Sequence, residues 1–193
     1  MTTNTKALGK RLPCVSNFEV GVNSTGVIQY MTQNLYEDNG YMVNEVLIQF
    51  TVDSFYNCYD NKRWTYSCYN VITDNAKNTW CRSPGTLEAI AFAETIMERI
   101  SYELSLDPLE VRLANVSSTH NEIVGMVDTL KTNSQYTERR AAVDNFNKEN
   151  RWKKRGLRFS LLRWTPLGYQ NFDVNLTVYH DDGTVAITHG GIE

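Results

Sequence analysis

The feature that most constrains the fold is an apolar stripe in the middle of the chain. After Ser83-Pro84-Gly85-Thr86, apolar residues recur every three or four positions, at Ile90, Ala93, Met97, Ile100 and Leu104. That spacing places them on one face of an α-helix, and it predicts a helix over about 86–105. Ser83 or Thr86 can cap the free amides at its start, whereas Pro84 fits the start of a helix but not its interior.

Three further helices are expected after this stripe. Asp107-Pro108-Leu109-Glu110 places an N-cap aspartate before a proline at the first helical position, which predicts a short helix ending at Asn115. A third helix is expected over 121–131. A fourth is expected over about 135–150, and its buried side would carry Tyr136, Val143 and Phe146.

Strand patterns precede the helical part of the chain. Phe18, Val20 and Val22 alternate with polar residues before a turn at 23–26, and a second strand is expected over 27–36. Another short strand is expected over 66–72. Between them, residues 43–55 fit a helical stripe, but their β-branched residues leave the assignment open.

Strand patterns also follow the helical part. An apolar run predicts a strand over 157–162. Farther on, Val174, Leu176 and Val178 alternate up to Asp181-Asp182-Gly183, which predicts a hairpin turn with Val185 and Ile187 on the returning arm.

The order of these segments predicts an α+β fold, with mixed or antiparallel strands around a central helical segment. We expect one body over 1–193, with a β-rich part at 1–75, a helical part at 86–150 and a β-hairpin part at 154–189. The chain is 193 residues long, which suits one domain or part of a larger one.

The composition of the chain argues against nucleic-acid and membrane partners. The formal net charge of -3 gives no electrostatic case for nucleic acid. No apolar run approaches the ~20 residues that span a bilayer, so no membrane partner is expected. The first residues show no apolar leader segment, and we therefore expect a cytoplasmic protein.

Cysteine and histidine usage predicts no metal site. The four cysteines include no pair spaced closely enough for zinc, and the three histidines are scattered. Buried free thiols are the expected state. A Cys/His nucleophilic pair stays open as a minor alternative, because such partners meet in space rather than in sequence.

The segment 78–86 is the candidate binding loop, because it lies between a predicted strand and the best predicted helix. Such a junction directs backbone N–H groups and the helix dipole at an anion, and Arg82 adds a forked guanidinium donor. The alternative is a capped helix start with an exposed arginine, and spacing alone favours it.

Other charged groups have structural explanations. The basic run 151–155 follows the C-terminus of the fourth predicted helix, where the dipole favours cations. Glu94, Glu98 and Glu103 are expected on the solvated side of the 86–105 helix.

Four blocks in order along the chain read NTWCRSPGTLEAIAFAETIMERI, DPLEVRLANV, FNKENRWKKRG and YHDDGTVAITHGGIE. Together they resemble the molybdenum hydroxylases, the aldehyde oxidase and xanthine dehydrogenase family. The first block is similar to the arginine loop of the family's molybdopterin-binding domain and the helix after it. The Trp-Cys-Arg-Ser-Pro-Gly combination resembles the insect aldehyde oxidase branch most.

The resemblance implies roles for three residues. Arg82 matches the family arginine whose loop contacts the molybdenum cofactor. Pro84 falls where xanthine dehydrogenases carry a stacking phenylalanine, and Phe50 falls about where they carry a purine-binding arginine. Losing a stacking ring and a guanidinium favours an apolar aldehyde pocket over a purine pocket.

The resemblance implies an enzyme that oxidises aldehydes to carboxylic acids with oxygen from water. In a complete enzyme of this family, two [2Fe–2S] clusters and FAD carry the electrons onward from a molybdenum–molybdopterin cofactor, and the enzyme is a homodimer.

The family's glycine–glutamine–glycine loop and the loop of its general-base glutamate are not found in this sequence, so no catalytic residue is assigned. We expect a partial molybdopterin-binding domain without turnover on its own. The alternatives are a purine hydroxylase fragment of the xanthine dehydrogenase type and a non-catalytic remnant that pairs with full-length subunits.

Overall fold

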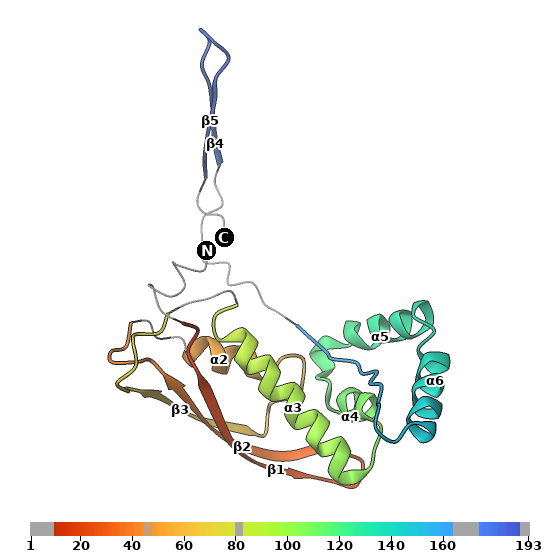
Figure 1. The fold of residues 1–193 in the computed structure, drawn as a ribbon. Helices are drawn as coiled ribbons and strands as arrows, with labels where there is room; N and C mark the ends of the chain where they lie inside the picture. Colours follow the sequence, from red (N-terminus) through yellow and green to blue (C-terminus); the bar gives the residue numbers. More distant parts are fainter. Residues whose placement is uncertain (1–9, 45, 47, 80–82, 164–173, 190–193) are drawn as a thin grey trace.

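The computed structural model of the chain describes residues 10–44, 46, 48–79, 83–163 and 174–189. Strands and helices share one body, and a separate two-stranded hairpin projects from it (Figure 1). The predicted α+β class is confirmed. Within the described residues, no helix is both long and apolar enough to cross a membrane.

A three-stranded sheet forms one layer of the body. Strand β1 (Cys14–Val22) pairs antiparallel with β2 (Ile28–Asp38), and β2 pairs parallel with β3 (Trp64–Val71). Two parallel neighbours need a crossover connection, and helix α2 (Ile48–Phe55) lies within it. The open assignment at 43–55 therefore resolves to a helix that starts at Ile48.

Helices α2 and α3 (Thr86–Leu104) pack over this sheet and enclose the core (Figure 1). Alternate residues of β2 point inward, so Met31 is 1% exposed and Leu35 is 0% exposed. The predicted stripe of α3 is buried in the same core, with Ala93, Met97 and Ile100 at 3% exposure or less.

The start of α3 differs from the expectation. Gly85 is the N-cap residue, with a φ of 67°, and no side chain among the described residues caps the helix. The predicted capping role of Ser83 or Thr86 is wrong, because the Thr86 hydroxyl instead donates to the Pro84 carbonyl at 3.3 Å. A glycine suits this position because a positive φ costs it little.

The next three helices lie beside one end of α3 (Figure 1). Helix α4 (Pro108–Asn115) begins as predicted, since the Asp107 carboxylate accepts from the Leu109 amide at 2.8 Å. Helices α5 (Glu122–Asn133) and α6 (Tyr136–Glu149) also agree with the predicted segments. Tyr136, Val143 and Phe146 are only half-buried on α6.

The predicted strand over 157–162 is wrong. Those residues are extended but pair with no strand among the described residues, and they run along the helices. Leu161 nevertheless enters the core at 4% exposure, and Phe159 packs edge-on against Tyr136 with ring centroids 4.8 Å apart. An apolar run that packs on helices has the same sequence pattern as a buried strand.

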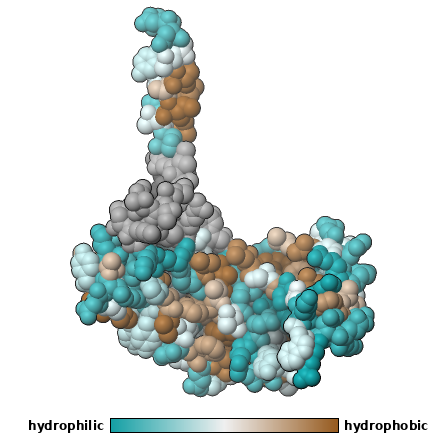
Figure 2. Space-filling model, in the orientation of Figure 1, coloured by the Kyte–Doolittle hydropathy of each residue, from teal (hydrophilic) through white to brown (hydrophobic). Residues whose placement is uncertain are grey.

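The hairpin of β4 (Val174–Val178) and β5 (Val185–His189) is confirmed, as is its turn at Asp181-Asp182-Gly183. Gly183 has a φ of 73°, and the Tyr179 amide donates to the Thr184 carbonyl at 2.9 Å. Every residue of both strands is exposed, and the ribbon is apolar along much of its length (Figure 2).

Candidate functional site

Residues 83–86, at the end of the candidate loop, form a tight corner at the start of α3. Ser83 and Gly85 both have positive φ values, 53° and 67°. The Leu87 amide donates to the Ser83 carbonyl at 3.3 Å, and the Ala89 amide donates to the Gly85 carbonyl at 3.0 Å. The corner therefore feeds directly into the first helical turn, as a strand–loop–helix anion site requires.

The corner rests on α2. A Cβ atom added to Gly85 would lie 2.6 Å from the Thr51 backbone nitrogen and 3.0 Å from the Phe50 carbonyl carbon. Only a residue without a side chain can approach another backbone so closely. The structure thus brings the predicted pocket residue Phe50 next to the corner that contains Pro84.

The predicted site residues differ in what the structure shows of them. Arg82 lies outside the described residues, as do Trp80 and Cys81. Phe50 and Pro84 are both half-buried, on α2 and in the corner respectively. The cofactor role of Arg82 and the substrate role of the other two remain predictions.

A small pocket opens beside the corner. Its walls come from the chain before β1, from β2, from the segment before the corner, and from α3, and they comprise Arg11, Leu12, Glu37, Thr79, Pro84, Gly85 and Glu88. The Arg11 guanidinium donates to Glu88 Oε1 at 3.0 Å. The pocket thus holds two carboxyl groups and one guanidinium, a balance that disfavours an anion inside it.

Thiol chemistry is disfavoured in the described part of the chain. Cys14, Cys58 and Cys68 form no disulfide with one another. Burial raises the pKa of Cys14 and of Cys58 to about 12. A thiol with such a pKa is protonated at neutral pH and is a weak nucleophile. No group of three or more metal-ligating side chains occurs among the described residues.

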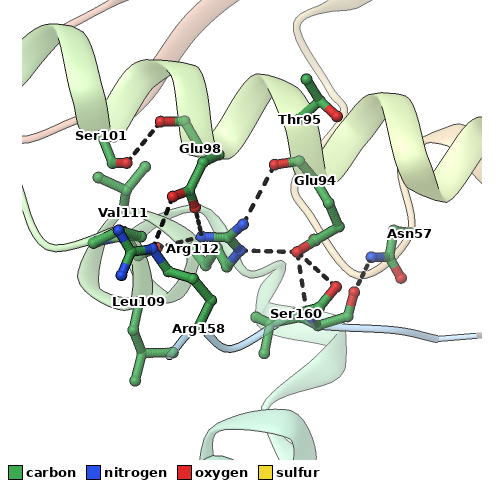
Figure 3. Close-up of polar contacts among 12 residues, drawn as sticks. Asn57, Glu94, Thr95, Glu98, Ser101, Leu109, Val111, Arg112, Arg158 and Ser160 are labelled. Carbon is green, nitrogen blue, oxygen red and sulfur yellow. Dashed lines mark hydrogen bonds and ion pairs between the residues drawn. The ribbon is translucent and has the colours of Figure 1, made fainter. Parts of the chain in front are cut away.

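A buried ionic cluster joins α3 and α4, and the sequence did not predict it (Figure 3). The prediction that Glu94 of α3 is solvated is wrong. Glu94 is buried and accepts a hydrogen bond from Arg112 Nε of α4 at 2.8 Å. Arg112, whose side chain is 4% exposed, also donates to Glu98 Oε2 at 3.2 Å and to the Pro108 carbonyl at 2.9 Å. Glu103 is exposed.

The same cluster anchors the extended segment before residue 164. Glu94 Oε2 accepts from the Ser160 hydroxyl at 3.1 Å and from the Leu161 amide at 3.3 Å, and Glu94 Oε1 accepts from Tyr59. Asn57 secures the segment from the other side, because its amide donates to the Leu161 carbonyl (Figure 3). The cluster is structural, and a pattern based on apolar spacing cannot reveal partners from separate elements.

The basic run 151–155 directly follows α6, as predicted, and is exposed. Arg155 stacks over Phe146, with its guanidinium carbon 3.9 Å from the ring centroid. The Lys154 ammonium donates to the Asn147 carbonyl at 2.5 Å. Both cations therefore contact the last turns of α6, where the helix dipole favours positive charge.

Comparison with known proteins gives the following likenesses. The family described as "Molybdopterin cofactor-binding domain" matches residues 1–116. A xanthine dehydrogenase of Dictyostelium discoideum is 29% identical over 99% of this chain, and aldehyde oxidase 3 of Mus musculus is 26% identical over 96% of it. The chain spans 15% of the length of each relative.

Solved structures agree on the fold. An aldehyde oxidoreductase from Desulfovibrio desulfuricans superposes on 71% of this chain and 16% of its own, with a TM-score of 0.63 and 20% identity. A second aldehyde oxidoreductase, from Desulfovibrio gigas, covers 75% of this chain and 17% of its own, with a TM-score of 0.62 and 21% identity.

Proposed function

Because the chain belongs to the molybdopterin cofactor-binding domain family of the molybdenum hydroxylases, we propose that it supplies the arginine-loop part of such a domain in an aldehyde-oxidising enzyme. The family supports the function of an oxidoreductase with a molybdenum cofactor. The observation that carries the proposal is the corner at 83–86, which leads from the segment after β3 into the 19-residue helix α3.

The corner, and not the pocket beside it, fits an anionic cofactor. Thr86 and the residues after it begin a long helix, whose N-terminal amides and dipole favour negative charge. Ser83 is exposed at the outer side of this corner. The pocket holds the carboxyl groups of Glu37 and Glu88 beside one guanidinium, so it offers an anion no excess of positive charge.

In this proposal Arg82 and the backbone of the corner hold the cofactor, and Phe50 and Pro84 shape the substrate cavity. The cofactor, when bound, supplies the redox chemistry of hydroxylation, and the protein positions it and excludes competing reactions. The close approach of Gly85 to Phe50 and Thr51 fixes the two predicted cavity residues relative to each other.

A purine substrate is the second candidate, because the xanthine dehydrogenase of Dictyostelium discoideum resembles the chain as strongly as the aldehyde oxidases do. The aldehyde assignment rests on Pro84, which offers no ring at the position of the stacking phenylalanine, and on Phe50, which offers no guanidinium at the position of the purine-binding arginine. Turnover of an aliphatic aldehyde and of xanthine, compared as kcat/KM in the longest natural polypeptide that carries residues 1–193, decides between them. A higher value for xanthine would overturn the aldehyde assignment.

Arg82→Ala, made in that same polypeptide, is expected to lower bound molybdenum at least about tenfold, because a charged hydrogen bond to a phosphate-like group contributes about 1.5–3 kcal/mol. Metal and pterin content per chain are measured in the purified protein. Arg63→Ala is the matched control, since Arg63 lies on the sheet side and bonds Gln29 at 3.1 Å. Full molybdenum occupancy in the Arg82→Ala variant would contradict the assigned role.

A further inference from the structure

Two glutamates line the pocket beside the corner, and each has one carboxyl oxygen without a partner among the described residues. Glu37 extends from the inner face of β2 and is 2% exposed. Glu88 extends from the first turn of α3, and its side chain is 13% exposed. Both line the same small pocket, which also contains Arg11 and Gly85.

Only one carboxyl oxygen of each glutamate accepts a hydrogen bond from a described residue. Glu37 Oε1 accepts from the Thr51 hydroxyl at 2.5 Å, and Glu88 Oε1 accepts from Arg11 at 3.0 Å. Glu37 Oε2 and Glu88 Oε2 are shielded from solvent and have no hydrogen-bond partner in the part of the chain that the structure describes. Buried oxygens are rarely left unbonded in folded proteins, and the described residues offer these two no hydrogen-bond donor.

The charges of the pocket indicate which donor serves these oxygens. Two ionised carboxylates beside one guanidinium leave a net negative charge in a buried place, which is costly. A metal ion is disfavoured, because Arg11 already lies in the pocket and no group of three metal-ligating side chains occurs in the described chain. A proton on one carboxyl group removes the excess charge and also supplies an O–H donor.

We propose that Glu37 carries a proton in the folded protein, and that this proton fastens the 83–86 corner to β2 and α2. When Glu37 loses it to solvent, the new carboxylate and Glu88 repel each other in a pocket with space for about one water-sized group, and the corner loosens. The step transfers only a proton, from the Glu37 carboxyl group to water. The proposal does not depend on what the corner binds.

The surroundings of Glu37 support this state. Burial raises the pKa of Glu37, the hydrogen bond from Thr51 opposes this, and the charge of Glu88 raises the pKa further. From β1, Cys14 lies opposite Glu37 in register, and burial raises its pKa to about 12. From β3, burial likewise raises the pKa of Cys68. These neighbours on the sheet therefore supply no positive charge that would keep Glu37 ionised.

Thr51 connects the proton to the corner. Its hydroxyl donates to Glu37, and a Cβ atom added to Gly85 would lie 2.8 Å from the same hydroxyl oxygen and 2.6 Å from the Thr51 amide nitrogen. A shift of Thr51 therefore displaces the backbone beneath the corner. The Ala89 amide, which donates to the Gly85 carbonyl at 3.0 Å, reports such a displacement through its hydrogen exchange.

The direct test is a pH titration of the ¹³C-labelled glutamate carboxyl carbons in the 193-residue chain. Glu37, assigned by its loss in Glu37→Gln, is expected to titrate above the ordinary glutamate pKa. Its midpoint is expected to move down in Glu88→Gln, which removes the charge of Glu88 but keeps an acceptor for Arg11. A Glu37 midpoint at or below the ordinary value, or one that Glu88→Gln leaves in place, overturns the proposal.

The same proton predicts a pH dependence of stability. Above the ordinary glutamate pKa the unfolded state loses the proton that folded Glu37 retains, so the free energy of unfolding falls as pH rises until the raised pKa is passed. Glu37→Gln, which mimics the protonated group, is expected to remove this slope and the accompanying loss of Ala89 protection. Glu149→Gln, on an exposed residue at the end of α6, is the control and should keep both. Equal slopes in the wild type and Glu37→Gln refute the proposal, and the wild-type titration decides it even if that variant does not fold.

Discussion

Replacing Arg112 with leucine is expected to lower the free energy of unfolding by about 3–5 kcal/mol, because removing one partner of a buried ion pair leaves the other charge uncompensated. Arg112 is 4% exposed and bonds Glu94, Glu98 and the Pro108 carbonyl. Chemical denaturation followed by circular dichroism measures the change.

Arg158→Ala is the matched control for that prediction. Arg158 also donates to Glu98, at 2.8 Å, but its side chain is 47% exposed. Exposed ion pairs contribute about 0–1 kcal/mol, so this variant should lose far less stability than Arg112→Leu. Equal losses in the two variants would show that burial does not set the strength of the cluster.

Gly85→Ala is expected to cost about 3 kcal/mol and to displace the corner. The φ of 67° disfavours any L-residue, and the added methyl group would lie 2.6 Å from the Thr51 nitrogen, which belongs to the backbone and cannot rotate away. We expect a lower midpoint in denaturant and faster hydrogen exchange at Ala89, which bonds the Gly85 carbonyl.

Gly125→Ala provides a control of opposite sign. Gly125 lies inside helix α5, and a Cβ atom added there meets nothing within 4 Å. Alanine is favoured over glycine in a helix interior by about 0.5–1 kcal/mol, so this variant should be more stable than the wild type. A similar loss in both glycine variants would mean that the contact with Thr51 is not the cause.

Local signals in the sequence located most of the helices correctly. The start of α4 was predictable because Asp107 and Pro108 act within one turn of the chain. The cap of α3 was not, because the positive φ of Gly85 follows from its contact with α2. The 157–162 segment was misassigned because apolar spacing does not tell whether a strand or a helix covers it.

In the candidate site, too, the sequence indicated some residues but not the contacts between elements that are distant in the chain. Phe50 and Pro84 were singled out from separate stretches of sequence, and the structure places their backbones side by side through Gly85. The burial of Glu94 could not be foreseen, because its partner Arg112 lies 18 positions away on another helix. A carboxylate on an apolar helix therefore gives no sign of being buried until the neighbouring helix is placed.

The hydrogen bonds between Asn57 and the 161–163 segment affect the order of folding during synthesis. The Asn57 amide donates to a carbonyl 104 residues later in the chain, and its oxygen accepts from the Arg163 amide 106 residues later. The family match ends at residue 116, so the ribosome completes the matched region well before it makes Leu161 and Arg163. A nascent chain can thus complete the matched region and still have an open slot in its core, which Leu161 fills only after both later helices have been made.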